Sequence, residues 1–309
     1  MHYIKLNIFL ILAALLTSSF SSAQIAENLD SLEKAMSVVK KNPDEIIHLG
    51  NLILSKTESG EQKSRVLGIL AVVYFEKNDL NQSTELFFQA KDAAEKTGNH
   101  ELIAKTYGSI AHQYIQLKLN DKAKFYLGKA IAQIEELPEG NNKNQLKGLS
   151  YLELGNVEFD NQNYKSANRN YRESLAHFQK MIEPGTKITY HYRRSLYNIG
   201  NSYIYLNQLD SAEYFLNQSL QIKDEENKEL KFFIYNSLAG IYSQKEFYRR
   251  AIDSLEAVLG NKDFHDERLR FEVFQNLSQN YKKLGNDERY YFYNEKYTSS
   301  SKILCSKAV

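Results

Sequence analysis

Apolar and small residues recur along this chain with a period of 39 to 45 residues. In each copy a large apolar or aromatic residue is followed three positions later by Leu or Ile, directly by a small residue, and usually by Tyr three positions on. The first copy reads Leu67-x-x-Leu70-Ala71-x-x-Tyr74. The small residues of the six copies are Ala71, Ala111, Gly155, Gly200, Ala239 and Ser278. Self-similarity at such a period predicts a repeat array in place of one compact core.

A second small residue follows twelve positions after the first, and a bulky residue stands four positions beyond it. These pairs are Ser83 with Phe87, Ala123 with Leu127, Ala167 with Tyr171, Ala212 with Leu216, and Ala251 with Leu255. A spacing of four places both members on one helix face, where the small residue admits a second helix and the large one fills the gap. Asn and Asp between the halves, as in Asn78-Asp79, predict a helix end and a capped helix start. The fifth copy lacks this turn signal around Glu246.

Helix breakers are scarce, with 3 Pro and 14 Gly in 309 residues. The pattern therefore predicts an all-α fold: an α-solenoid of antiparallel helix pairs with about six repeats. A degenerate pair, Leu29 to Val39 and Pro43 to Leu54, is expected before them. The expected divisions are a signal peptide over 1–23, the degenerate pair over 24–63, the solenoid over 64–298 and a flexible tail over 299–309.

The first 23 residues have the features of a secretory signal peptide. Lys5 precedes the nine-residue apolar run 8–16, and Ser21-Ser22-Ala23 places small residues before a cleavage site at Gln24. The run is short for a membrane helix, and no later segment is apolar enough for one. We expect a periplasmic or secreted protein, with an uncleaved anchor as the alternative. Because Cys305 is the single cysteine, no internal disulfide is possible.

The two halves together resemble the tetratricopeptide repeat (TPR) signature W-x-x-L-G-x-x-Y…A-x-x-x-F…A, with Tyr, Leu or Phe in the Trp place. The resemblance covers residues 64–298. The period exceeds the usual one of about 34, and Glu158 replaces the Tyr of the third repeat. The resemblance implies a right-handed superhelix in which the first helix of each pair, helix A, lines a concave groove. The organisation is also similar to extracytoplasmic TPR regions of bacterial signalling proteins.

In the TPR family, positions just before and after the small residue of helix A face the ligand. Amide side chains gather at these positions in repeats three to six, and an Asn offers a peptide backbone both a donor and an acceptor. The candidate groove residues are Asn156, Asn201, Asn198, Tyr197, Asn236 and Gln279, together with Arg194 and His112. Asn156 and Asn201 have an alternative role, which is to hydrogen-bond neighbouring repeats. Arg193 and Arg194 either attract an acidic ligand or are ordinary surface charge.

No catalytic constellation appears, because the seven His have no ligand spacing and no nucleotide-binding or nucleophile motif occurs. We therefore expect no enzymatic activity, no cofactor and no metal. A net charge of +1 does not suggest nucleic-acid binding. The predicted function is a non-enzymatic scaffold, exported to the cell envelope, that holds a protein or peptide ligand in the groove. The alternative is a detached or truncated sensor region of a histidine kinase or transcriptional regulator. The sequence leaves the oligomeric state open.

Overall fold

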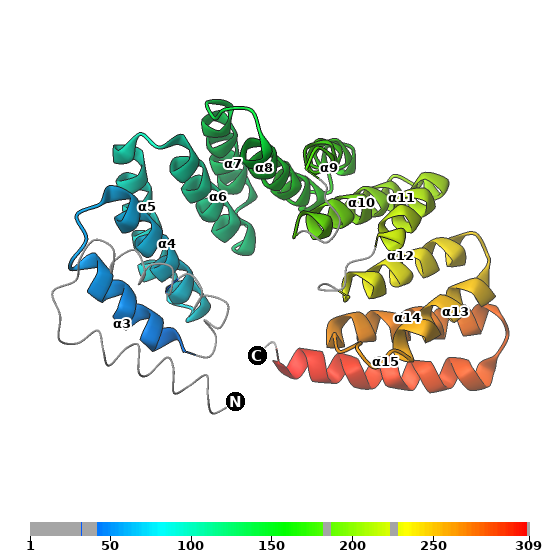
Figure 1. Cartoon of the computed structure of the whole chain (residues 1–309). Helices are drawn as coiled ribbons and strands as arrows, with labels where there is room; N and C mark the ends of the chain where they lie inside the picture. Colours follow the sequence, from blue (N-terminus) through cyan, green and yellow to red (C-terminus); the bar gives the residue numbers. More distant parts are fainter. Residues whose placement is uncertain (1–31, 33–41, 182–186, 223–227, 308–309) are drawn as a thin grey trace. The chain divides into compact units, whose positions relative to one another are not determined.

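A computed structural model of the chain describes residues 32, 42–181, 187–222 and 228–307. Within these residues the chain forms α-helices and no β-strand (Figure 1), which confirms the all-α prediction. The helices are α3 (Pro43–Leu54), α4 (Gly60–Glu76), α5 (Leu80–Thr97), α6 (His100–Gln116), α7 (Asn120–Glu135), α8 (Asn141–Asp160), α9 (Tyr164–Gln179), α10 (Lys187–Tyr205), α11 (Leu209–Gln221), α12 (Leu230–Gln244), α13 (Tyr248–Leu259), α14 (Glu267–Lys283) and α15 (Asp287–Lys307). The signal peptide and the helix expected from Leu29 to Val39 fall outside the described residues, apart from buried Leu32.

The chain divides into two compact units. Unit 1 comprises residues 1–114 and 128–137, and unit 2 comprises residues 115–127 and 138–309. The division passes through α6 and α7, so each of these helices contributes to both units.

Consecutive helices pack against one another throughout α8 to α15 of unit 2 and from α3 to α5 of unit 1. In unit 2 each helix A (α8, α10, α12 and α14) packs on the helix B that follows it (α9, α11, α13 and α15), and α9, α11 and α13 pack on the next helix A. Consecutive helices A also touch, α8 with α10, α10 with α12 and α12 with α14. In unit 1, α4 packs on α5 and α3 packs on α4. This succession is the packing of an α-solenoid, in which each repeat is buried mainly by its neighbours.

The predicted small residues lie where helices A and B approach most closely. A Cβ atom added to Gly155 would overlap the ring of Tyr171, the bulky residue of the same repeat. A Cβ atom at Gly200 would lie 2.7 Å from Cγ of Leu216. In the first repeat the Ser83 hydroxyl donates a 2.7 Å hydrogen bond to the Ala71 carbonyl oxygen. The small and large positions read from the sequence therefore set the distance between the two helices.

A residue with a positive φ stands two positions after the end of the first helix of every repeat, which is seven positions after the small residue. These residues are Asn78, Lys118, Gln162, Asn207, Glu246 and Gly285, with φ between 56° and 72°. The amide of the following residue donates back across the turn, as from Phe247 to the Tyr242 carbonyl oxygen at 2.8 Å, and this bond is typical of a Schellman motif. Glu246 forms the same turn, although no Asn, Asp or Gly around it predicts one. The backbone hydrogen bonds impose the left-handed conformation even on residues that do not favour it.

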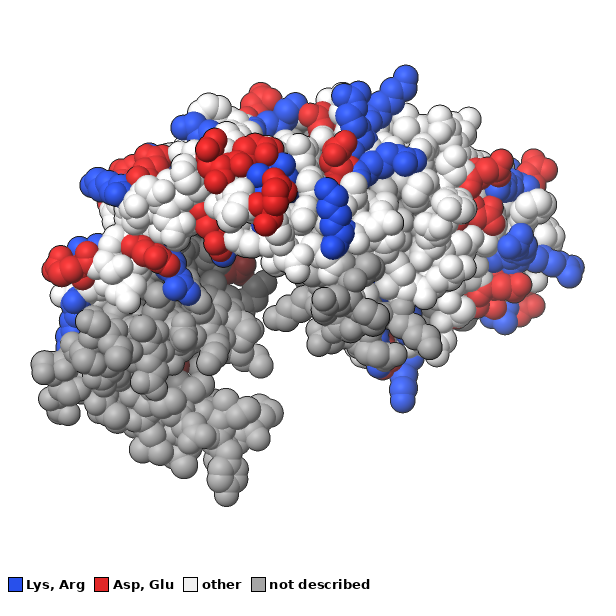
Figure 2. All heavy atoms as spheres, turned by 45° about the horizontal axis from the view of Figure 1, so that its top comes forward, with Lys and Arg blue, Asp and Glu red and all other residues white. Residues whose placement is uncertain are grey.

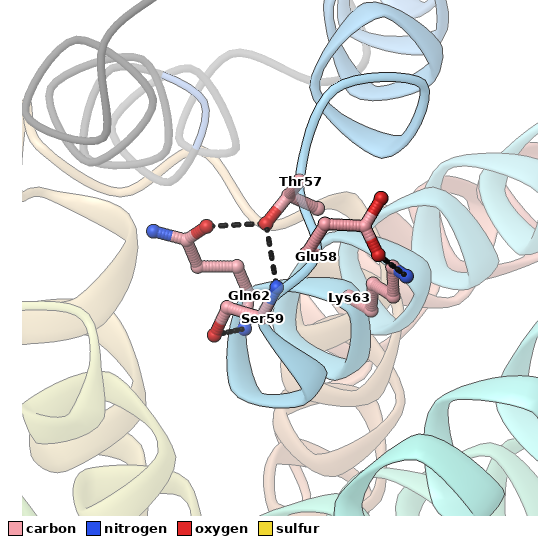
Figure 3. Close-up of polar contacts among 5 residues, drawn as sticks. All are labelled: Thr57, Glu58, Ser59, Gln62 and Lys63. Atoms are coloured by element: carbon pink, nitrogen blue, oxygen red, sulfur yellow. Dashed lines mark hydrogen bonds and ion pairs between the residues drawn. The ribbon is translucent and has the colours of Figure 1, made fainter.

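Side-chain caps begin several helices. At the start of α4 the Ser59 hydroxyl accepts from the amide of Gln62 at 3.3 Å, and the Ser59 amide donates to the Thr57 hydroxyl at 3.2 Å (Figure 3). Lys63 and Glu58 form an exposed ion pair beside this cap at 3.5 Å. These contacts satisfy amide groups that have no partner within the first turn of the helix.

The last helix is longer than the sequence indicated. We expected a flexible tail over 299–309, but α15 continues as a helix to Lys307. Ser299, Ser300 and Ser301 lie inside it, and no Gly or Pro follows Asp287 to end the helix.

We predict that Gly155→Ala lowers the free energy of unfolding by about 1–3 kcal/mol, because the new methyl group overpacks against Tyr171. Gly240→Ala is the matched control, since a Cβ atom there meets no other atom within 4 Å. That change is expected to stabilise α12 by about 0.5–1 kcal/mol through helix propensity. Urea unfolding of both variants measures the difference, and stabilisation by Gly155→Ala would show that the two helices do not approach at this site.

Candidate functional site

Three of the predicted groove residues line one hollow in unit 2. Asn156 lies on α8, and Asn198 and Asn201 lie on α10, the neighbouring helix A. The hollow has a volume of about 190 Å³ and is completed by Phe159, Asp160 and Tyr171. The repeat register therefore identified side chains that come together from two repeats.

Asn156 is the centre of a hydrogen-bond network in this hollow. Its Oδ1 accepts from the Tyr171 hydroxyl at 3.1 Å and from Nδ2 of Asn198 at 3.3 Å. Its Nδ2 donates to a carboxylate oxygen of Glu153 at 3.1 Å. Burial raises the pKa of the Tyr171 hydroxyl, which therefore stays protonated and able to donate. The network fixes the orientation of the Asn156 amide.

Similar bonds join the helices A of the later repeats. The Ser237 hydroxyl donates to Oδ1 of Asn201 at 2.9 Å. The Tyr197 hydroxyl interacts with both Asn201 and Ser237. Burial raises the pKa of this hydroxyl, and the hydrogen bonds with Asn201 and Ser237 lower it. In the next interface Nδ2 of Asn276 donates to Oδ1 of Asn236 at 2.8 Å. Neighbouring repeats are thus held together by the predicted amides, as the alternative role for Asn156 and Asn201 required.

The remaining candidates lie outside this network. Gln279 is exposed on α14, and His112 is exposed on the part of α6 that belongs to unit 1. Arg194 is half-buried on α10 near His191. Burial lowers the pKa of His191, and the charge of Arg194 lowers it further. The structure therefore gathers the candidates of repeats three and four, and it places His112 in the other unit.

Arg193 is buried, which corrects the role expected for it from the sequence. We considered it surface charge or a ligand contact, but it is only 3% exposed. Its Nε donates to the carbonyl oxygen of Ser219 at 3.1 Å, and the Ser219 hydroxyl donates to the Arg193 carbonyl oxygen at 2.9 Å. These two bonds tie α10 to α11, so Arg193 supports the fold.

Unit 1 contains a larger hollow, of about 560 Å³, between α4 and α6. Ile69 and Val72 line it from α4, at the register positions two before and one after the small residue. Lys105 and Ser109 line it from α6. Because these positions carry no amide, this hollow does not repeat the chemistry of the site in unit 2.

Glu158, the residue in place of the repeat Tyr, forms a polar contact that sequence reasoning missed. Its side chain is 11% exposed and pairs with the Lys124 ammonium at 2.6 Å. It also accepts a hydrogen bond from Nδ2 of Asn163 at 2.9 Å. An ion pair with the preceding repeat has replaced an aromatic contact here.

Glu272 on α14 lies beside the amide network of the last repeats. It is half-buried and accepts a hydrogen bond from Nδ2 of Asn236 at 3.3 Å. Burial raises the pKa of its carboxyl, Arg268 lowers it, and Asp266 adds to the rise. The charged form of Glu272 is therefore less favourable in the folded chain than in water.

The surface carries both signs of charge. Lys and Arg are interspersed with Asp and Glu over the face shown in Figure 2, as a net charge of +1 leads one to expect. None of the helices in the described part of the chain combines the length and apolar character that a membrane span needs.

Comparisons with known proteins agree with the repeat pattern. The family model described as "Tetratricopeptide repeat" matches residues 104–135 and 194–226. A comparison with curated proteins finds no match.

Three solved structures illustrate the shared fold. The apo form of RapI is 13% identical, with a TM-score of 0.66 over 96% of this chain and 91% of that one. A Rap protein complexed with Competence and Sporulation Factor is 15% identical, with a TM-score of 0.61 over 99% and 93%. PH0952 from Pyrococcus horikoshii, a signal transduction ATPase with a tetratricopeptide repeat sensor, is 16% identical, with a TM-score of 0.65 over 85% of this chain and 39% of that one. At such identities the likeness concerns the fold.

We predict that Glu272→Gln raises the free energy of unfolding at pH 7. The amide avoids burying a charge and keeps an acceptor for Asn236. Because the folded-state pKa of Glu272 is raised, the wild-type carboxyl becomes neutral as the pH falls through that pKa. The difference in free energy of unfolding between the variant and the wild type should therefore shrink as the pH falls through the pKa of Glu272.

Glu158→Gln is the matched control, and it should lower the free energy of unfolding at pH 7. Burial raises the pKa of Glu158, but hydrogen bonds from Lys124 and Asn163 outweigh it and leave the pKa lowered. The stability that this carboxylate contributes is present at pH 7 and is lost as the pH falls through the lowered pKa. Denaturant unfolding from pH 7 to pH 3 measures both variants, and equal effects at pH 7 would contradict these assignments.

Proposed function

We propose that this chain, which matches the tetratricopeptide repeat model at residues 104–135 and 194–226 and has an α-solenoid fold, is a non-enzymatic scaffold that holds an extended peptide or protein segment. The segment lies against the helix A surface of unit 2, where Asn156, Asn198 and Asn201 line one hollow. That hollow is the observation that carries the proposal.

The chemistry of the hollow suits a peptide backbone. An extended chain presents an amide donor and a carbonyl acceptor at every residue, and an Asn side chain can complement either. Hydrogen bonds from Tyr171 and to Glu153 already hold Asn156 in place. A ligand therefore has little side-chain freedom to restrict there, which lowers the entropy cost of binding.

The amides serve the fold and the ligand together in this proposal. Oδ1 of Asn156 already accepts two hydrogen bonds, so this residue offers a ligand carbonyl the second proton of its Nδ2. Asn198 donates one Nδ2 proton to Asn156, and its own oxygen is an acceptor. The bonds that join the repeats orient these groups toward the hollow. A relative of the same fold, the Rap protein complexed with Competence and Sporulation Factor, supports a binding role by analogy of fold.

We also propose that the protein acts outside the cytoplasm. The charged start, the apolar run 8–16 and the small residues 21–23 are the features that support export. The mature chain is then expected to begin at Gln24.

A sensor is the second candidate function. PH0952 supports this function by analogy of fold, because it is described as a signal transduction ATPase with a tetratricopeptide repeat sensor. This chain covers 39% of that longer protein. In this version the ligand bound to unit 2 changes the state of an effector. Both versions require the same binding surface.

We predict that a photo-crosslinking residue at Tyr205, introduced in the native cell, captures one dominant protein or peptide partner. Tyr205 is 59% exposed and its ring meets Phe159 of the hollow, so a reactive group at this position lies beside the hollow. Tyr214 on α11, which is 58% exposed and does not line the hollow, is the matched control position. Asn198→Ala should reduce the yield at position 205 by roughly the 5- to 150-fold that one buried hydrogen-bonding group contributes.

Mass spectrometry of the adducts identifies the partner and the first residue of the mature chain. Equal adducts at positions 205 and 214, or a yield at 205 that Asn198→Ala leaves unchanged, would contradict binding in this hollow.

A further inference from the structure

Three aromatic rings form a cluster at the edge of the hollow in unit 2. Tyr164 at the start of α9 stacks on Tyr205 at the end of α10, with ring centroids 4.6 Å apart and planes 19° apart. Phe159 of α8 meets Tyr205 edge-on at 5.0 Å and Tyr164 at 5.2 Å. Tyr205 remains 59% exposed, so much of its ring faces solvent.

A carboxylate lies next to this cluster. Asp160 follows Phe159 in the sequence and lines the same hollow. Its Oδ2 accepts from the ammonium of Lys118 at 2.7 Å, in a pair whose side chains are 37% and 73% exposed respectively. Such an exposed pair contributes little stability. Asp160 thus already binds a cation of the chain itself, and a cation of a ligand can replace it.

Asp160 and Tyr205 occupy equivalent positions in consecutive repeats. Each stands five residues after the small residue of its helix A. The same position in the other repeats is occupied by Glu76, Gln116, Gln244 and Lys283. An acidic residue followed by an aromatic one therefore occurs at the boundary of repeats three and four alone.

The chemistry of this corner favours a basic side chain. A guanidinium group is planar, so it can stack on the open part of the Tyr205 ring and donate to the Asp160 carboxylate. An apolar side chain would use the ring alone, and an acidic one would be repelled by the carboxylate. Arg194 and Glu153 also act on Tyr171 of the hollow, with opposite signs: the charge of Arg194 lowers the pKa of its hydroxyl and that of Glu153 raises it.

We propose that Asp160 and Tyr205 form a specificity pocket for a basic side chain, arginine in preference to lysine, of the segment that the neighbouring amides hold. This inference rests on the proposed peptide-binding function and adds the chemical class of the ligand. It also assigns a role to the most exposed ring beside the hollow.

Selection of random heptapeptides displayed on phage, against the full-length protein, tests the pocket. We expect a sequence motif with a basic residue at one fixed position. Tyr205→Ser and Asp160→Asn should each remove the preference at that position and keep the rest of the motif. Tyr214→Ser, at an equally exposed tyrosine, and Asp210→Asn, at an acid paired with Lys245 at 2.8 Å, are the matched controls and should select the wild-type motif.

The selected peptide then gives a quantitative test. Replacing its arginine with citrulline, which has the same shape and no charge, should weaken binding roughly five- to thirtyfold. Lys118→Gly should strengthen binding, because it removes the competing ammonium, and glycine suits the φ of 58° at that position. A loss of affinity in that variant would contradict competition for Asp160.

The outcomes separate this inference from the proposed function. A motif without a basic position, or one that survives Tyr205→Ser and Asp160→Asn unchanged, overturns the pocket and leaves peptide binding in place. Selection of no motif by the wild-type protein overturns peptide binding, and the pocket with it.

Discussion

The close approach of the two helices within each repeat is the constraint on which the rest of the structure depends. It requires a residue without a bulky side chain on helix A and a large one on helix B, as with Gly155 and the ring of Tyr171. Tyr171 belongs to a buried cluster with Leu152, Ala167 and Ile199, which come from α8, α9 and α10. One contact therefore fixes the distance within a repeat and contributes to the packing of the next repeat.

The same contact links the core to the candidate site. The Tyr171 ring is buried against Gly155, and its hydroxyl donates to Asn156 in the hollow. A shift of the helix pair would move the hydroxyl and release the amide that it orients. The hollow is thus positioned by packing, and its polar groups do not depend on a mobile loop. In the proposed binding role, these polar groups are ordered before a ligand arrives, which lowers the entropy cost of binding.

The amides between repeats show why sequence alone left their role open. Asn156 and Asn201 stand at positions where both a scaffold bond and a ligand contact satisfy the same pattern. The structure shows the scaffold bonds, from Asn198 to Asn156 and from Ser237 to Asn201. These bonds explain how stacked helices with polar faces stay in register. They are compatible with ligand binding, since an amide group can form several hydrogen bonds.

Features that recur with the repeat could be predicted, and features that occur once could not. The small and large positions, and the bounds of α3 from Pro43 to Leu54, follow from periodicity and from helix-start signals. The turn at Glu246 could not be predicted from its residue type, because backbone hydrogen bonds and not the side chain determine its conformation.

Non-recurring contacts depend on which residues of distant segments meet. The burial of Arg193 depends on the Ser219 carbonyl oxygen of the next helix. The neighbourhood of Asp160 and Tyr205 depends on the stacking of two particular repeats. A pattern read along one chain contains no information of that kind.

The most direct test of this account is a double-mutant cycle on the contact between helices A and B. Gly155→Ala, Tyr171→Leu and the combination of both are compared with the wild type by urea unfolding. The combined variant recreates the Ala239 and Leu255 pair that the fifth repeat uses in the same positions. We expect Gly155→Ala to destabilise the wild type but not the Tyr171→Leu variant, with a coupling energy of about 0.5–3 kcal/mol. Strictly additive effects would contradict it, because they would mean that these two residues do not set the spacing of the repeat.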